Sequence, residues 1–169
     1  MTTLTHTLVG AAVAKAALTG HAIHADPMLV YTVSVLAANL PDINVPFIGL
    51  RRSFYRNHRL SAFHLPLFWI ALFLIIQILL PDHTWKTILP YAAVGIVNIF
   101  LHFILDLFSL HNGVCLLAPF LKREYSITRL KDRPETIRLY LRTYTKSVLF
   151  KGELLGSLFL LGYLLTKPF

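Results

Sequence analysis

Long runs of apolar residues constrain the fold of this chain more than any other feature of its sequence. The clearest runs are residues 63–80 and 88–110, and a third is Val148–Leu165, which carries Lys151 and Glu153 near its first turn. A membrane-spanning helix needs about 20 predominantly apolar residues, with a range of about 17 to 25. The sequence therefore predicts an all-α integral membrane bundle.

Two N-terminal segments, residues 7–19 and 27–40, are shorter, and Lys15 interrupts the first. Their many small residues suit close helix packing. The expected bundle thus has about four to five transmembrane helices. A short basic amphipathic helix is expected on the membrane surface at residues 134–144. The whole chain, residues 1–169, is expected to form a single membrane-embedded domain.

The composition agrees with a membrane protein. Hydrophobic residues make up 56% of the chain and charged residues 14%, whereas a soluble domain carries about 25% charged residues. The net charge of +8 could indicate nucleic acid, but contact of basic loops with anionic headgroups explains it better, and no nucleic-acid partner is expected. The single cysteine excludes an internal disulfide.

The basic residues also predict an orientation. They gather in residues 42–62 and in a loop at about 112–147, whereas residues 20–26 contain no Lys or Arg and residues 81–87 contain only Lys86. Basic loops belong in the cytoplasm. With five helices, the N-terminus would be inside and the C-terminus outside.

Polar residues inside the apolar segments indicate a site. His102 and Asp106 are four residues apart, so they share one helix face, with Asn98 one turn deeper. On the predicted topology, further polar residues reach the same depth near the cytoplasmic face, while His21, His24 and His83 fall on the other side. The six candidate metal ligands are His6, Asp42, His58, His64, His102 and Asp106.

Ionisable residues inside a membrane are costly and normally mark a site. Imidazole and carboxylate groups are ligands for zinc, manganese and iron, and a bound cation compensates buried carboxylates. A divalent metal is expected, zinc first, with manganese or magnesium as alternatives. Taken singly, four of these residues have another explanation: His102 as a hydrogen-bonded core residue, Asp42 as a helix cap, His58 as a loop residue that faces the headgroups, and His6 as a flexible terminal residue. His111 is a further possible ligand, but a loop position explains it better than a role in the site.

At these residues the chain resembles the YdjM-like family of LexA-regulated, inner-membrane, predicted metal-dependent hydrolases. The segments that carry the resemblance lie within residues 3–120 and read "THTLVGAAVA", "ANLPDIN", "NHRLSAFH" and "LHFILDLFSLHNGVCLLAPF". The resemblance implies a multi-pass protein of the bacterial inner membrane. Because the family is placed near zinc-dependent phospholipase C and P1-type nucleases, it also implies phosphoester hydrolysis at a multi-metal centre.

The chain departs from the family pattern in two places. Asn44 stands where the second aspartate of the family is expected, and it could ligate a metal only through a neutral oxygen. The spacing from His58 to His64 is six residues, one more than in the family pattern, and Leu65 replaces a serine.

The resulting functional hypothesis is a membrane-bound hydrolase that cleaves a phosphoester of a lipid or other amphiphile at the cytoplasmic face. A metal ion would lower the pKa of water towards about 7. Asp42, Arg59 and Asp106 are the expected catalytic residues, with Arg59 either clamping a phosphate or anchoring the chain at the headgroups. The alternative is a non-catalytic metal-binding membrane protein: a sensor, a structural module or an ion carrier. A carrier needs polar groups along a path to the other face, and residues 88–97 hold no charged side chain.

Overall fold

Helices account for the regular structure of the chain. The computed structural model describes residues 2–20, 23–43, 61–108, 113–121, 123–127 and 137–166. In chain order the helices are α1 (Thr3–Thr19), α2 (Pro27–Asn39), the 3₁₀ turn η1 (Leu40–Asp42), the 3₁₀ turn η3 (Ala62–His64), α5 (Pro66–Leu79), α6 (Asp82–Asp106), α7 (Ile137–Lys146) and α8 (Val148–Leu165). Apart from an isolated β-bridge between Val114 and Tyr125, these ranges contain no β structure, so the predicted all-α class is confirmed.

Local sequence signals set where the helices begin. Thr2 caps α1, because its hydroxyl oxygen accepts the N–H of Thr5 at 3.3 Å. Asp26 caps α2 in the same way, accepting the N–H of Leu29 at 2.9 Å. Pro66 opens α5, where its fixed φ suits the first helical position and its missing N–H costs nothing.

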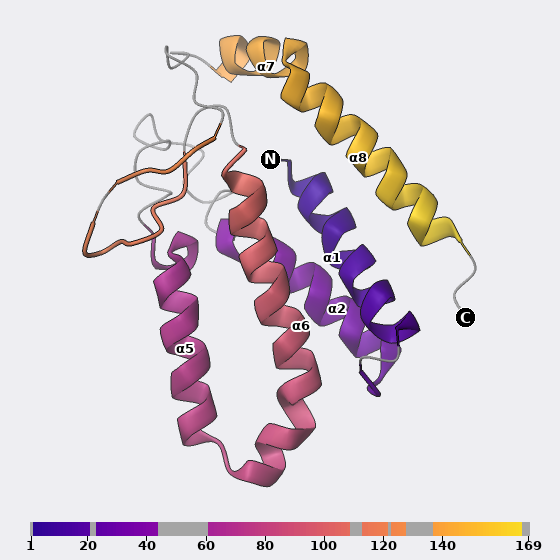
Figure 1. Cartoon of the computed structure of the whole chain (residues 1–169), viewed down its shortest axis with the longest axis vertical. Coiled ribbons are helices and arrows are strands. Elements are labelled where there is room, and N and C mark those ends of the chain that lie inside the picture. The colour runs from indigo at the N-terminus through magenta and orange to yellow at the C-terminus, as the bar shows by residue number, and fades with distance from the viewer. Residues whose placement is uncertain are drawn as a thin grey trace.

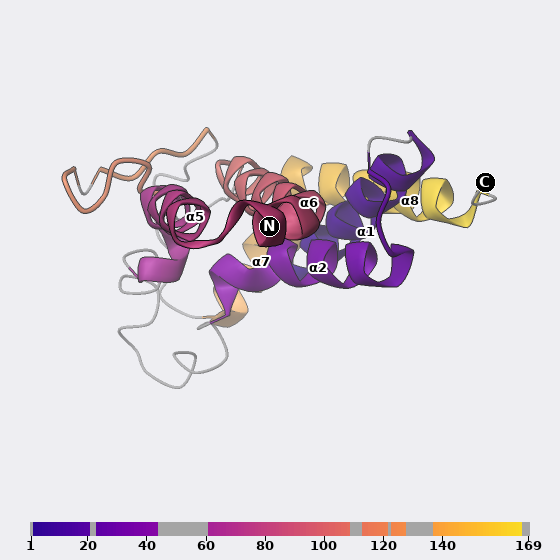
Figure 2. The ribbon, with the colours of Figure 1, turned by 90° about the horizontal axis from the view of Figure 1, so that it is seen from below.

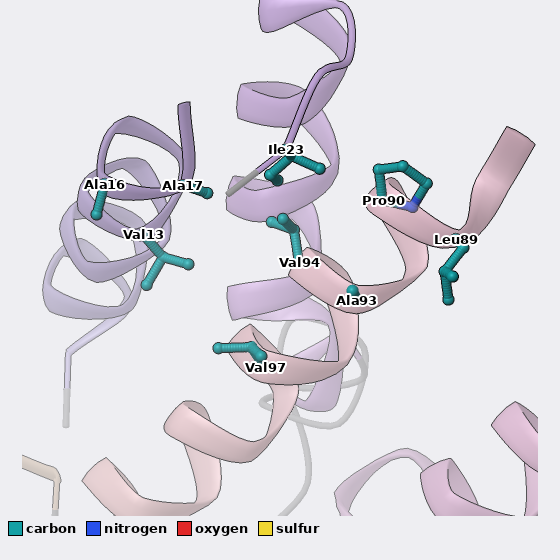
Figure 3. A pocket seen from close by; sticks show the side chains of 9 residues that line it. All are labelled: Val13, Ala16, Ala17, Ile23, Leu89, Pro90, Ala93, Val94 and Val97. Atoms are coloured by element: carbon teal, nitrogen blue, oxygen red, sulfur yellow. The ribbon is translucent and has the colours of Figure 1, made fainter. Parts of the chain in front are cut away.

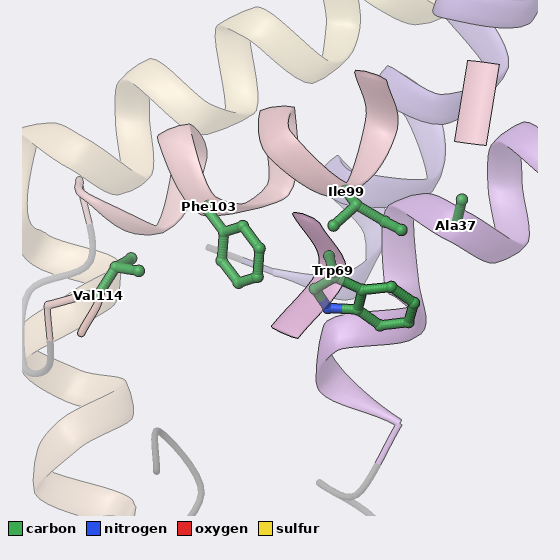
Figure 4. Close-up of a cluster of buried hydrophobic side chains, with 5 residues drawn as sticks. All are labelled: Ala37, Trp69, Ile99, Phe103 and Val114. Carbon is green, nitrogen blue, oxygen red and sulfur yellow. The ribbon is translucent and has the colours of Figure 1, made fainter. Parts of the chain in front are cut away.

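The helices pack as a flat group around α6. α5 and α6 form an antiparallel hairpin, α1 and α2 pack side by side next to α6, and α8 lies along the outer side of α1 (Figures 1 and 2). An apolar cluster joins the hairpin to α2 and to the loop that follows α6 (Figure 4). Its five buried side chains are Ala37, Trp69, Ile99, Phe103 and Val114.

Two helices of the described residues are long and apolar enough to cross a membrane. They are α6, with 25 residues and a mean hydropathy of 2.1 over its most apolar 18 residues, and α8, with 18 residues and a mean hydropathy of 1.6. α8 has the predicted bounds. α5 has only 14 residues, because residues 62–64 form a 3₁₀ turn and Pro66 opens the helix. α1 has 17 residues and α2 has 13. The prediction of four to five spans is therefore not confirmed.

Two charged residues within apolar helices fasten α1 to α8. Lys15 does not interrupt α1; its ammonium donates to the carbonyl oxygens of Tyr163 at 2.6 Å and Thr166 at 2.7 Å, at the C-terminal end of α8. At the opposite end, the Glu153 carboxylate of α8 accepts the N–H and the hydroxyl of Thr2, each at 2.7 Å. Each charge thus lies at the helix end of complementary sign, so α1 and α8 run parallel.

Candidate metal centre

The centre lies where α2 and α6 end and α5 begins. Pro41 closes α2, since proline has no N–H to continue the helix, and the short turn η1 then carries Asp42. The turn η3 ends at His64, immediately before α5. α6 supplies His102 and Asp106 from its last two turns, as predicted. Three elements distant in sequence therefore meet at one place.

The four side chains form one compact group. One potential ligand atom from each of Asp42, His64, His102 and Asp106 can be chosen so that all four atoms lie within 4.8 Å of one another. His64, His102 and Asp106 are almost completely buried, whereas the Asp42 side chain is 25% exposed. The group is therefore closed on the protein side and open beside Asp42.

The separations within this group fit a shared cation better than direct hydrogen bonds. The Nε2 atom of His64 lies 3.3 Å from Oδ2 of Asp106, and Nε2 of His102 lies 3.7 Å from the same oxygen and 3.6 Å from Oδ1 of Asp42. Hydrogen bonds of this kind measure roughly 2.7 to 3.2 Å. Ligands bound about 2.0 to 2.2 Å from a tetrahedral Zn²⁺ lie about 3.4 Å from each other.

A backbone carbonyl fixes which nitrogen of His102 faces the group. Nδ1 lies 2.8 Å from the carbonyl oxygen of Ala38, and because a carbonyl only accepts, the proton is on Nδ1. Ala38 is in the last turn of α2, where carbonyl groups lack partners within the helix. Nε2 then carries a lone pair and, among the described residues, has no hydrogen-bond partner although it is buried. A metal ligand oriented through its other ring nitrogen has this arrangement.

His64 is oriented from the same segment. Its Nδ1 atom lies 3.4 Å from both the carbonyl oxygen of Pro41 and Oδ1 of Asp42, which leaves Nε2 facing Asp106. Two imidazoles and two carboxylates, each with a ligand atom directed at one volume, are a donor set that suits zinc, manganese or iron. The residues therefore fit a divalent cation.

His6 lies beside the four-residue group. Its ring stacks on that of His102, with 4.0 Å between ring centroids and 21° between planes. Its Nε2 atom lies 3.6 Å from Oδ1 of Asp106, on the opposite carboxylate oxygen from His64 and His102. Both ring nitrogens are buried and lack a hydrogen-bond partner within the described part of the chain. His6 is thus placed to bind, through Nε2, a cation that Oδ1 of Asp106 also contacts.

A second polar layer lies one helical turn below the group. The Ser34 hydroxyl donates to the carbonyl of Gly10 at 2.6 Å and accepts from the amide of Asn98 at 2.7 Å. Gly10, Ser34 and Asn98 lie four residues from His6, Ala38 and His102, respectively. The layer therefore connects α1, α2 and α6 by hydrogen bonds one helical turn from the site. Gly10 permits this approach, because a Cβ there would lie 2.9 Å from the Cβ of Ala38.

Sequence reasoning missed this layer as part of the site. The small residues of α1 and α2 predicted close packing, and Asn98 was placed one turn below His102. No feature of the sequence indicates that the Ser34 hydroxyl joins Gly10 to Asn98. Gly10 and Asn98 each lie four residues from a candidate ligand, His6 and His102. Ser34 lies four residues from Ala38, whose contact with His102 is evident only in the structure.

The other residues that the sequence singled out lie outside the described residues or away from the group. His58, Arg59, Asn44 and His111 lie outside the described residues, and so does His21. His83 is in the first turn of α6, about 28 Å along the helix axis from His102. His24 precedes α2, at the end of that helix remote from Asp42. Within the described chain, four of the six predicted ligands form the group and His6 adjoins it.

Comparison with known proteins then assigns the chain to a family. A family model described as YdjM inner membrane protein matches residues 1–169. The chain belongs to that family. The match shows that the YdjM resemblance, which we expected over residues 3–120, extends over the entire chain. It also establishes a membrane protein, in agreement with the two long apolar helices. Neither the curated proteins nor the solved structures give a match, so the expected likeness to phospholipase C and P1-type nucleases has no support.

Proposed function

We propose that this YdjM-family protein is a membrane-bound metal-dependent hydrolase that cleaves a phosphoester of a lipid or other amphiphile. The observation that carries the proposal is a group of converging ligand atoms from Asp42, His64, His102 and Asp106. The site is buried except beside Asp42. Buried ionisable groups in a membrane protein are costly and usually functional. A zinc ion fits this donor set best, with manganese as an alternative; magnesium fits less well because it prefers oxygen ligands.

A divalent cation bound here supplies Lewis acidity, which lowers the pKa of water towards about 7 and offsets negative charge on a phosphate. The protein side chains divide the remaining work. His64, His102 and Asp106 form the buried wall of the site and fix its shape. Asp42 stands on the exposed side, where substrate and water arrive, and its carboxylate is placed to accept a proton. In this proposal Arg59 clamps the phosphate.

A structural role is the second candidate, and one observation favours it. The group joins η1, η3 and α6, and the hydrogen-bond chain through Ser34 joins α1, α2 and α6 immediately below. A cation in the group would therefore hold separate elements together, as structural metals do. Such a protein would bind metal and gain stability from it without hydrolysing any substrate.

The direct test of the proposed function is an assay of the purified, detergent-solubilised protein. We expect hydrolysis of a chromogenic phosphodiester or a phospholipid that depends on added Zn²⁺ or Mn²⁺ and stops on chelation. The assay is repeated with His102→Ala to exclude a contaminating enzyme. Absence of hydrolysis with every metal and phosphoester tested, together with a large fall in melting temperature on chelation, would instead establish the structural role.

The proposed location is the bacterial inner membrane, in a multi-pass arrangement with the site near the cytoplasmic face. Support comes from the arginine-rich segment before residue 61 and the basic loop at about 112–147.

In a background lacking Cys115, we expect Asn57→Cys to react with a membrane-impermeant maleimide only from the cytoplasmic side. His83→Cys, at the end of α6 remote from His102, should react only from the opposite side of the membrane. Labelling of both positions from one side would contradict this orientation.

A further inference from the structure

Two apolar grooves lie on different faces of α6. The α1-side groove, of about 540 Å³, is lined by side chains of α1 and α6 and by Ile23 (Figure 3). The α5-side groove, of about 340 Å³, runs between α2, α5 and α6. Its lining includes Val33, Ala37, Trp69, Phe73, Ala92 and Ile99. Both volumes fall in the range of roughly 300 to 1,000 Å³ that is typical of small-molecule sites.

Only the α5-side groove lies in line with the metal centre. Residues spaced three or four apart share a helix face, and one such series along α6 passes from the groove into the centre. It comprises Ile88, Ala92, Gly95 and Ile99 in the groove, followed by His102 and Asp106. The α1-side groove is lined by Ala93 and Val97, which lie on the other side of α6, and by Val94. The buried, hydrogen-bonded Asn98 lies between Val94 and His102.

The other walls of the α5-side groove converge on the same end. Leu40 lines the groove two residues before Asp42, and Trp69 lines it at the start of α5, five residues after His64. The indole N–H of Trp69 also donates to the carbonyl of Phe63 at 2.8 Å, beside His64. The remote end, at Ile76 and Ile88, approaches the turn of the α5–α6 hairpin. From Ile88 to Ile99 the groove extends about 16 Å along the helix axis.

We propose that the α5-side groove holds an acyl chain of the lipid substrate, with the polar ester end at the metal centre. This inference rests on the proposed function, which it refines from an amphiphile to a lipid with at least one long acyl chain. The argument is chemical complementarity along one axis. An apolar groove points along α6 towards a site of charged ligands. The protein belongs to an inner-membrane family, and acyl chains are the solvent inside a membrane.

Adjacent alanines of α6 provide matched variants. Ala92 lines the α5-side groove and Ala93 lines the α1-side groove, so Ala92→Phe fills the first and Ala93→Phe fills the second. Binding is measured by quenching of Trp69 fluorescence in a Trp85→Phe background, using a lysophosphatidylcholine brominated along its acyl chain. We expect strong quenching that Ala92→Phe relieves and Ala93→Phe does not. Ala92→Leu and Ala93→Leu serve as milder fillers if a phenylalanine variant fails to fold.

The second measurement is the preference for a long-chain over a short-chain phospholipid in hydrolysis. We expect Ala92→Phe to lower this preference at least about tenfold, since each lost methylene contact in an apolar pocket costs roughly tenfold or more. The rates of Ala93→Phe should stay unchanged. Equal quenching and equal preference in both variants would overturn the inference. If Ala92→Phe alone relieves the quenching but the protein hydrolyses no phosphoester, acyl-chain binding in the α5-side groove would be supported and the proposed function would be contradicted.

Discussion

His102→Ala and Asp106→Ala are each expected to remove most of the metal that co-purifies with the protein. The physical reason is that both side chains direct a ligand atom into one volume, with Nε2 of His102 and Oδ2 of Asp106 separated by 3.7 Å. Loss of residues that merely orient ligands lowers metal affinity by roughly 10- to 100-fold, so loss of a ligand should cost more than about 100-fold. Elemental analysis gives the metal per chain, and competition with a chromogenic chelator gives the affinity.

Histidines remote from the centre provide the control. His24→Ala and His83→Ala remove imidazoles near the other ends of α2 and α6, and their metal content should equal that of the unmodified protein. Asp106→Ala should have the larger effect, because Asp106 faces His64 and His102 with one oxygen and His6 with the other. An equal loss of metal from all four variants would show nonspecific histidine binding and would contradict a defined centre.

Hydrophobic periodicity and spacing predicted much of this fold. The last helix was predicted with its observed bounds, and the meeting of His102 and Asp106 follows from their separation of four residues on α6. The number of spans could not be derived in the same way. Ala62 and Phe63 are apolar like the helix that follows, and no hydropathy signal distinguishes a 3₁₀ turn from a first helical turn. Pro66 is the sequence signal that marks the boundary.

The detailed chemistry of the centre was not predictable from the sequence. Which nitrogen of His102 faces the group depends on the carbonyl of Ala38, which lies in the last turn of α2. The roles of Lys15 and Glu153 were equally hidden. Each is a charged residue in an apolar helix, where burial of an unpaired charge would cost free energy. Each charge is instead hydrogen-bonded at the end of a helix about 150 residues away in the chain. Such pairings arise from tertiary packing.

Asp42→Asn is expected to lower phosphoester hydrolysis by about 100-fold or more while the protein still folds. The substitution keeps the shape of the side chain and one ligand oxygen but removes the charge and the proton acceptor, and a positioned general base contributes roughly 10²- to 10⁴-fold to a rate. Little stability should be lost, because Asp42 is the least buried member of the group, with 25% of its side chain exposed. The measurements are the hydrolysis rate, the metal content, and the melting temperature with and without chelator.

Asp26→Asn is the matched control for this variant. Asp26 caps α2 far from the centre, and asparagine caps a helix about as well as aspartate, so rate and melting temperature should both be retained. A catalytic Asp42 predicts a loss of rate that exceeds the loss of metal, with a nearly unchanged melting temperature. If Asp42→Asn instead lowers the melting temperature as much as chelation does, and leaves the rate per bound metal unchanged, then the carboxylate only helps to hold the cation. The proton-accepting role proposed for Asp42 would then be wrong.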